Sequence, residues 1–206
     1  MAVGKDRLGI ERSLWSQGYK RIMGLDEVGR GCLSGPVVAA GVILSPNTAD
    51  TPYQDSKSLS EADRLELDRK IRDEALYYTI QYCDPREVDR LNILKASIQA
   101  MIRCAESGGA PDFLLVDGNR FADTLLPCQC IIGGDNRSAT IAAASILAKV
   151  YRDRLMRRLH EEYPQYGWNR NVGYPTRKHY EALKEFGYTR YHRKSFNLKT
   201  DRPFAG

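Results

Sequence analysis

The stretch Met23-Gly-Leu-Asp-Glu-Val-Gly-Arg-Gly31 is the starting point for interpreting this chain. Its apolar lead-in predicts a short strand that ends at two adjacent carboxylates, Asp26 and Glu27. Adjacent residues inside a regular strand point to opposite faces, so these two acids can converge only where the strand ends and the backbone turns. Gly29 and Gly31 permit that turn and let main-chain N–H groups come close to a ligand. Two carboxylates, an arginine and accessible backbone indicate a site for a hard cation and a phosphate group.

Two other interpretations of this stretch compete with a site. An Asp-Glu pair after a strand can be a solvated turn, which is about as common as a site when the pair stands alone. A dinucleotide-binding loop requires a third glycine, and Ser34 stands where that glycine belongs. Its phosphate would also face Asp26 and Glu27 with no metal between them. The dinucleotide loop is therefore disfavoured.

Length and composition predict a single globular domain. The chain has 206 residues, of which 42% are hydrophobic and 28% are charged, a size that supports a good core in one domain. We expect residues 1–206 to form that domain, with an N-terminal arm over about residues 1–20. A basic helical extension is expected over about residues 155–206.

The sequence favours a cytoplasmic protein. No apolar run reaches the length of a membrane span, and the charged N-terminus has no signal-peptide core. The five cysteines are an odd number without a secretory context, so we expect reduced thiols. Cys128 and Cys130 lack a second pair at zinc-binding spacing and are better explained as strand or core residues.

The charge distribution points toward nucleic acid. The net charge is +5, and basic residues dominate after Asp135, with aromatic residues lying among them. A basic half interleaved with aromatics suits a phosphate backbone with sugar or base contacts. The alternative is a helical surface whose charges are simply solvated. The residues concerned include Lys149, Arg152, Arg154, Arg157, Arg158, Tyr166, Trp168, Tyr174, Tyr180 and Arg193.

Three predicted strands each end at acids. In open α/β sheets ligands gather at strand ends, and four carboxylates there would repel one another unless cations lay between them. The ligand set contains only oxygen, which favours Mg²⁺ or Mn²⁺ over zinc or copper. A turn or cap remains the alternative for each aspartate alone, and Asp135 could cap a helix predicted from residue 140. The acids are Asp26 with Glu27, Asp117 and Asp135, after strands at about 22–26, 113–116 and 128–132.

The remaining elements alternate in an α/β pattern. Ser60, with Asp63 three residues later, predicts a helix N-cap and a capping box. Pro164 is expected to end the extension of the long helix. The other predicted strands cover about 36–44 and 77–82, and helices are predicted over about 60–75, 93–106, 140–159 and 175–187.

Taken together, these segments resemble bacterial type 2 ribonuclease H, also called RNase HII. The matches occur in family order across about residues 22–197, with departures only at Asn136 and in the variable patch 169–171. The matching segments are Gly24-Leu-Asp-Glu-Val-Gly-Arg-Gly31, Asp55-Ser-Lys-Ser-Leu59, Leu115-Val-Asp-Gly-Asn-Arg120, Gly134-Asp135, Ile141-Ala-Ala-Ala-Ser-Ile-Leu-Ala-Lys149, Tyr163-Pro-Gln-Tyr-Gly167, Gly173-Tyr-Pro-Thr176 and His192-Arg-Lys-Ser-Phe196.

The resemblance implies an α/β protein with the RNase H-like fold, in which helices flank a five-stranded mixed sheet and a helical extension follows. It implies an endonuclease that hydrolyses the RNA strand of RNA–DNA hybrids and incises duplex DNA 5′ of single ribonucleotides. Catalysis would use two divalent ions, Mg²⁺ or Mn²⁺, and leave 3′-hydroxyl and 5′-phosphate ends. A sliding clamp is a candidate partner, although the tail 199–206 has no clear docking motif, and a monomer is expected.

The resemblance also assigns roles to individual residues. The catalytic and metal-binding acids would be Asp26, Glu27, Asp117 and Asp135. Substrate contacts would come from Gly29, Arg30 and Gly31 at the ribose 2′-hydroxyl and phosphate, from Tyr174 at the sugar, and from Lys57 and Lys149 at backbone phosphates. Asp153 is left out of the metal set as an acid on the helix surface. The chemistry needs no side-chain nucleophile, so His160, His179 and His192 receive no such role. His179 is expected on a helix surface, and His192 either there or in packing.

Two rival functions remain at this point. Another enzyme of the same nuclease fold, such as a type 3 ribonuclease H, usually carries an extra N-terminal domain, and about twenty residues before the first strand leave no room for one. A nucleic-acid-binding module that has lost catalysis would lack some of the acids. All four acids are present here, which favours the enzyme.

Overall fold

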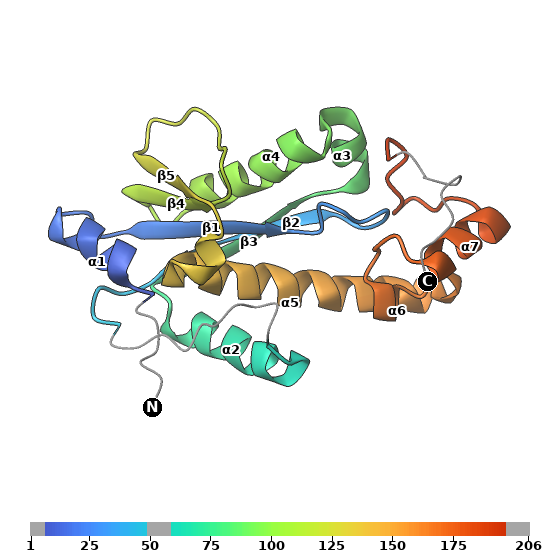
Figure 1. Ribbon diagram of the computed structural model, residues 1–206, viewed down its shortest axis with the longest axis horizontal. Helices are drawn as coiled ribbons and strands as arrows, with labels where there is room; N and C mark the ends of the chain where they lie inside the picture. Colours follow the sequence, from blue (N-terminus) through green and yellow to red (C-terminus); the bar gives the residue numbers. More distant parts are fainter. Residues whose placement is uncertain (1–6, 49–58, 197–206) are drawn as a thin grey trace.

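The computed structural model describes residues 7–48 and 59–196. A five-stranded sheet lies at its centre, in the strand order β3-β2-β1-β4-β5 (Figure 1). β1 pairs antiparallel with β2 and parallel with β4, so the sheet is mixed, as predicted. The strands are β1 (Ile22–Val28), β2 (Val37–Ile43), β3 (Tyr77–Cys83), β4 (Phe113–Asp117) and β5 (Cys128–Ile131).

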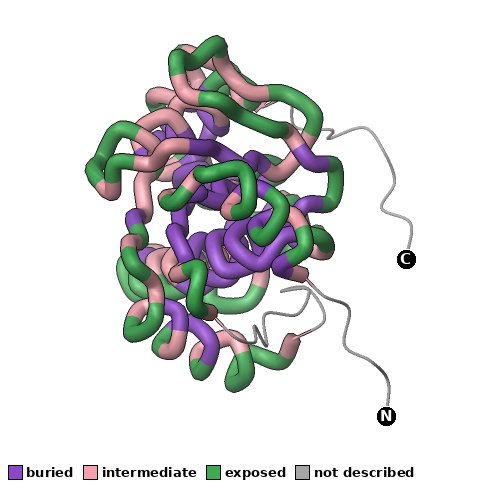
Figure 2. The backbone as a smooth tube through the Cα atoms, turned by 90° about the vertical axis from the view of Figure 1, so that its left-hand side faces the viewer, coloured by how far each residue is buried: buried purple, intermediate pink, exposed green. Residues whose placement is uncertain are grey.

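Helices cover both faces of the sheet. The long helix α5 packs on β1 and β2 from one side, α4 packs on β2 and β3 from the other, and α2 lies against the outer side of α5 (Figure 1). The view in Figure 2 shows buried backbone gathered around the long central helix and exposed backbone at the rim. The helices are α1 (Gly9–Ser16), α2 (Glu61–Glu74), α3 (Pro85–Leu91), α4 (Ile93–Glu106), α5 (Ala139–Glu162), α6 (Trp168–Asn171) and α7 (Arg177–Phe186).

The N-terminal half of α5 is small and apolar because it crosses the sheet at close range. Its alanines and Ile146 lie in a buried cluster with β2 and α2. Gly24 of β1 faces the start of this helix, where an added Cβ would come within 2.3 Å of the main-chain carbon of Thr140. Ser138 is the N-cap of α5 and accepts a hydrogen bond from the Ile141 N–H. The alternative that Asp135 caps this helix is therefore wrong.

Capping boxes fix the starts of two other helices. Ser60 and Asp63 form the expected capping box at the start of α2, since each side chain bonds the main-chain N–H of the other. Asp84 and Glu87 form a second capping box at α3, with Pro85 in the first turn. These local bonds satisfy N–H groups that a helix start leaves open.

The C-terminal extension has an aromatic core of its own. Tyr166 and Trp168 are stacked with ring centroids 5.1 Å apart, and both are almost completely buried. His179 and His192 pack against them with 0% and 2% exposure. The expectation of His179 on a helix surface is thus wrong, because the amphipathic α7 turns this side chain inward. Several aromatics predicted to contact nucleic acid instead hold the extension together.

We expect Gly24→Ala to lower the free energy of unfolding by about 2 kcal/mol or more, because the new methyl group would meet main-chain atoms that cannot move aside alone. Urea titration followed by circular dichroism measures this. Gly31→Ala is the matched control, since its Cβ would meet only Tyr174 at 3.8 Å, and a change within about 0.5 kcal/mol is expected. Equal stability of the two variants would contradict the close packing of β1 on α5.

Candidate active site

The acids gather where β1 continues beyond its pairing with the parallel strand β4. The last paired residues of β1 and β4 are Leu25 and Val116, so Asp26 and Asp117 follow side by side on adjacent strands. The expectation that β1 ends at the acids needs correction. β1 continues through Glu27 to Val28, paired with β2 alone. Along residues 26–28, the edge of β1 that faces β4 has no partner strand. This open edge lets the carboxylates of Asp26 and Glu27 line one pocket.

That pocket unites residues that are far apart in the sequence. Its volume is about 380 Å³, and it is reached by side chains from β1, the end of β4, the 3-10 turn η1 (Gly134–Asn136), α2 and α5. All four predicted acids line it together with two of the predicted substrate contacts, Lys149 and Tyr174. The full lining is Asp26, Glu27, Val28, Arg64, Asp117, Asp135, Ser145, Lys149 and Tyr174.

Burial and mutual repulsion dominate the electrostatics of the pocket. Asp26 is only 7% exposed, and its burial raises its pKa well above the usual range, with Glu27 and Asp117 adding repulsion. Burial also raises the pKa of Glu27, against the opposing charge of Arg30, whose guanidinium lies 3.1 Å from the carboxylate. Such carboxylates are poised for a nearby cation, which would relieve the repulsion between them.

Each acid is engaged by protein donors in this arrangement. Asp26 Oδ1 accepts a hydrogen bond from the Glu27 N–H at 2.7 Å, and Asp117 Oδ1 accepts one from the Gly134 N–H at 2.7 Å. Across residues 7–48 and 59–196, no three histidine, cysteine or acidic side chains form a ready-made ligand cluster. The donor set nevertheless fits Mg²⁺ or Mn²⁺, because it offers only oxygen ligands that repel one another.

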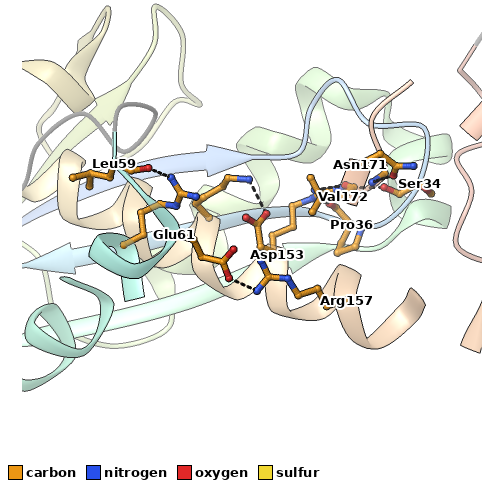
Figure 3. Close-up of polar contacts among 12 residues, drawn as sticks. Ser34, Pro36, Leu59, Glu61, Asp153, Arg157, Asn171 and Val172 are labelled. Atoms are coloured by element: carbon orange, nitrogen blue, oxygen red, sulfur yellow. Dashed lines mark hydrogen bonds and ion pairs between the residues drawn. The ribbon is translucent and has the colours of Figure 1, made fainter. Parts of the chain in front are cut away.

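Two buried arginines support the loop beside the pocket. Arg152 of α5 is fully buried and donates hydrogen bonds to the carbonyls of Ser34, Pro36 and Val172 at 2.8–3.0 Å (Figure 3). Gly29 has a φ of 93° and lies so close that a Cβ would come within 2.3 Å of Arg152 Nε. A glycine is therefore needed there for both conformation and space.

The second of these arginines is Arg193. It is 1% exposed and donates to the carbonyls of Arg30 and Gly35, both at 3.0 Å. Burial lowers the pKa of Arg193 to about 10, so it stays charged at neutral pH. The sequence interpretation counted Arg152 and Arg193 among candidate phosphate contacts, and that was wrong for both side chains. Nothing in the sequence pattern separates them from their exposed neighbours.

Tyr174 is held from behind by the two buried histidines. His192 Nδ1 accepts a hydrogen bond from the Thr189 N–H at 2.9 Å, which leaves its proton on Nε2. That N–H points to His179 Nε2 at 3.1 Å, so His179 carries its proton on Nδ1 and donates it to the Tyr174 carbonyl at 2.9 Å. The chain of donors fixes both tautomers and anchors the backbone of a residue that lines the pocket.

The other predicted contacts have different outcomes. Lys149 lines the pocket, and its ammonium group lies 2.7 Å from Asp153, one turn later on α5. The Asp153 side chain is only 15% exposed, so it is a partner of Lys149 and less of a surface acid than expected. It does not line the acid pocket. Lys57 lies outside the described residues.

Comparison with known proteins agrees with this geometry. The sheet order and the helix across it define the ribonuclease H fold. The solved PCNA:RNase HII complex from Archaeoglobus fulgidus has a chain with a TM-score of 0.70 and 26% identity, covering 88% of this chain and 98% of that one. Bst-RNase HIII in complex with Mn²⁺ gives a TM-score of 0.65 and 17% identity, covering 87% and 68%.

The sequence comparisons are more specific. The ribonuclease HII family model matches residues 23–199. The ribonuclease HII of Salinibacter ruber is 53% identical over 94% of this chain and 100% of its own length. That of Bacteroides thetaiotaomicron is 50% identical over 86% and 90%. This chain belongs to the ribonuclease HII family and is an RNA-cutting hydrolase.

The buried histidines predict a pH-dependent stability. Burial and the neighbouring His179 lower the pKa of His192 to about 3, and burial lowers that of His179 too. An unfolded chain protonates them below its ordinary histidine pKa of about 6.5. The stabilisation is therefore complete above about pH 6.5 and is lost as the pH falls toward 3. Between pH 6.5 and 5, His192 should contribute a loss of about 2 kcal/mol.

Urea unfolding of the wild-type protein and His192→Gln at several pH values tests this. The variant is expected to be less stable at pH 7 but to lose less stability than wild type as the pH falls to 5. His160→Gln, which leaves both buried histidines in place, should follow the wild-type slope. Parallel pH profiles of wild type and His192→Gln would contradict the inward, neutral His192.

Proposed function

We propose that this protein cuts the RNA strand of RNA–DNA hybrids and incises duplex DNA on the 5′ side of single embedded ribonucleotides. The observation that carries the proposal is the pocket that unites Asp26, Glu27, Asp117 and Asp135 beside the loop 29–31 and Tyr174. Cleavage leaves a 3′-hydroxyl and a 5′-phosphate, so the ribonucleotide stays on the downstream piece. Two observations support this chemistry: the chain belongs to a ribonuclease family, and its four acids offer a metal only oxygen ligands.

The four acids are proposed to hold two divalent ions, Mg²⁺ or Mn²⁺. When bound, these ions would stabilise the attacking and leaving oxygens and lower the pKa of the attacking water. The protein supplies the geometry through rigid elements: β1 and the end of β4 fix Asp26 and Asp117, and Asp135, which is 4% exposed, lies in η1. The related HIII enzyme solved with Mn²⁺ supports a metal of this class.

Ribose selection is proposed to come from the loop and Tyr174. The 2′-hydroxyl is the one group that separates RNA from DNA at a given position. A deoxynucleotide that left a buried donor or acceptor unpaired would cost about 1–3 kcal/mol per contact. Arg193 fixes the Arg30 carbonyl and His179 fixes the Tyr174 carbonyl. Both backbone segments therefore meet the sugar in a preset geometry, which supports discrimination.

The setting of the reaction is also a proposal. Replication and repair of DNA in the cytoplasm is the proposed context, with a monomer as the working state. The Archaeoglobus fulgidus enzyme was solved in complex with PCNA, which supports a sliding clamp as a partner. Among the described residues, no helix has the length and apolar character to cross a membrane.

Asp26→Asn is expected to lower nicking by at least about a thousandfold, because it removes a ligand charge from the metal site. Duplex binding should change less than about threefold. A duplex with one embedded ribonucleotide, incubated with Mg²⁺ or Mn²⁺, provides the nicking assay, and fluorescence anisotropy without divalent ions provides the binding constant. Asp73→Asn, on the exposed face of α2, is the control and should cut normally. Equal losses of binding and nicking in Asp26→Asn would refute a metal-ligand role.

Tyr174 allows a test of ribose packing. Its ring is 41% exposed and lines the pocket, so Tyr174→Ala should lower kcat/KM for the ribonucleotide duplex at least tenfold through lost packing on the sugar. Tyr174→Phe keeps the ring and should retain more activity than the alanine variant. A Tyr174→Ala protein with more than half of the wild-type kcat/KM would rule out this packing role.

A further inference from the structure

A basic surface adjoins the acid pocket, in the groove between α2 and α5. Two neighbouring hollows form it: a near hollow of about 10 Å³ beside the acid pocket and a far hollow of about 870 Å³. Six arginines and three acids line these hollows, and we call this surface the arginine groove. The arginines are Arg64, Arg69, Arg72, Arg154, Arg157 and Arg158, and the acids are Glu61, Asp68 and Asp153.

The groove is continuous with the acid pocket. Arg64 lines both the pocket and the near hollow, while Arg154 and Arg157 line both hollows. From Lys149 in the pocket to Arg158 at the far end, α5 advances nine residues, or about 14 Å. A duplex repeats one base pair per about 3.4 Å. The arginine groove is therefore long enough to accompany about four base pairs beyond the pocket.

The three acids of the groove are already engaged by cations. The Asp68 side chain is 2% exposed and bonds Arg72 at 3.0 and 3.1 Å, with Arg154 at 3.7 Å. Glu61 holds Arg157 at 2.6 Å (Figure 3). The pairs of Asp68 with Arg154 and of Glu61 with Arg157 fasten α2 to α5, and the pair of Asp68 with Arg72 lies within α2, so all three have a structural purpose. Asp153, in turn, holds Lys149.

Arg69 and Arg158 have no such structural purpose. Both are exposed, and in the described part of the chain neither has a carboxylate within salt-bridge distance. Arg158 also follows Arg154 at i+4 on α5, a spacing at which like charges repel and weaken a helix. The fold would be at least as stable with neutral residues there. A planar guanidinium suits phosphate oxygens better than an ammonium does, and every basic residue that lines this groove is an arginine.

We propose that the arginine groove binds the phosphate backbone of the substrate duplex, about one to four base pairs from the scissile bond. Arg69 and Arg158 are the contacts that are free to meet it. This inference rests on the proposed function, because it takes the duplex in the acid pocket as its starting point. One long polyanion explains a basic track that runs out of the pocket.

The test replaces the two exposed arginines together, as Arg69→Gln with Arg158→Gln. The matched control is Lys20→Gln with Lys95→Gln, which removes the same charge from exposed sites, one before β1 and one on α4 across the sheet. Binding is measured without divalent ions, so that no cutting occurs, on a duplex of about 20 base pairs with a central ribonucleotide. Circular dichroism and urea unfolding verify that both variants fold.

The groove variant should bind about five- to tenfold more weakly than wild type at 0.1 M salt. Its slope of log K against log salt concentration should be smaller by nearly two, as expected for two lost phosphate contacts. The control pair should keep the wild-type slope to within about half of that change.

Two one-sided duplexes locate the contact. Each ends about two base pairs from the ribonucleotide, one on its 5′ side and the other on its 3′ side. Removing the arm that lies over the groove should weaken wild type but not the groove variant. Equal affinity and slope for groove and control variants would overturn the proposal, as would a loss that is the same on every duplex. Wild-type protein that binds but never nicks with Mg²⁺ or Mn²⁺ would instead refute the proposed function.

Discussion

The architecture around the acid pocket depends on one buried cation, the guanidinium of Arg152. It lies at 0% exposure, and the carbonyl oxygens that satisfy it come from Ser34, Pro36 and Val172. A buried charged side chain is tolerated only when its N–H groups form hydrogen bonds within the protein. Folding α5 against the sheet therefore obliges the loop after β1 and the segment before Tyr174 to close over the same side chain. Two segments about 140 residues apart in sequence are set in register by this constraint.

Glycines allow this closure because backbone must lie directly on side chains. Besides Gly29 above Arg152, a Cβ at Gly35 would lie 2.4 Å from Met156 Sδ, and one at Gly173 would lie 2.5 Å from the Ser34 carbonyl oxygen. All three have positive φ angles. The loop that borders the pocket thus packs directly on α5, and its conformation is set by buried side chains of that helix. A loop that is shaped in this way is already ordered before any ligand binds.

The sequence predicted the sheet and the meeting of the four acids because their signals are local. Apolar runs such as 113–116 end directly at acids. The capping box of α2 is likewise contained in the four residues from Ser60 to Asp63. The sequence did not predict the burial of Arg152 or His179, since each looks like an ordinary helix-surface residue among charged neighbours. Their burial is decided by loops that arrive from more than a hundred residues away or, for His179, by the separate core of the extension. The continuation of β1 past Asp26 was missed for a similar reason. It depends on pairing with β2 beyond the point where the pairing with β4 stops, and the local sequence of β1 does not show this.

The two buried arginines beside the pocket place positive charge near the acids without pairing with them. Arg152 donates hydrogen bonds to three carbonyls and Arg193 donates to two, so neither neutralises a carboxylate of the pocket. Arg30 differs from them, because it forms an ion pair with Glu27 at 3.1 Å and its side chain is 51% exposed. The Glu27 side chain of the pair is only 11% exposed, so the pair lies at the boundary between the pocket and solvent. Opening it would free the carboxylate and the guanidinium in the same movement.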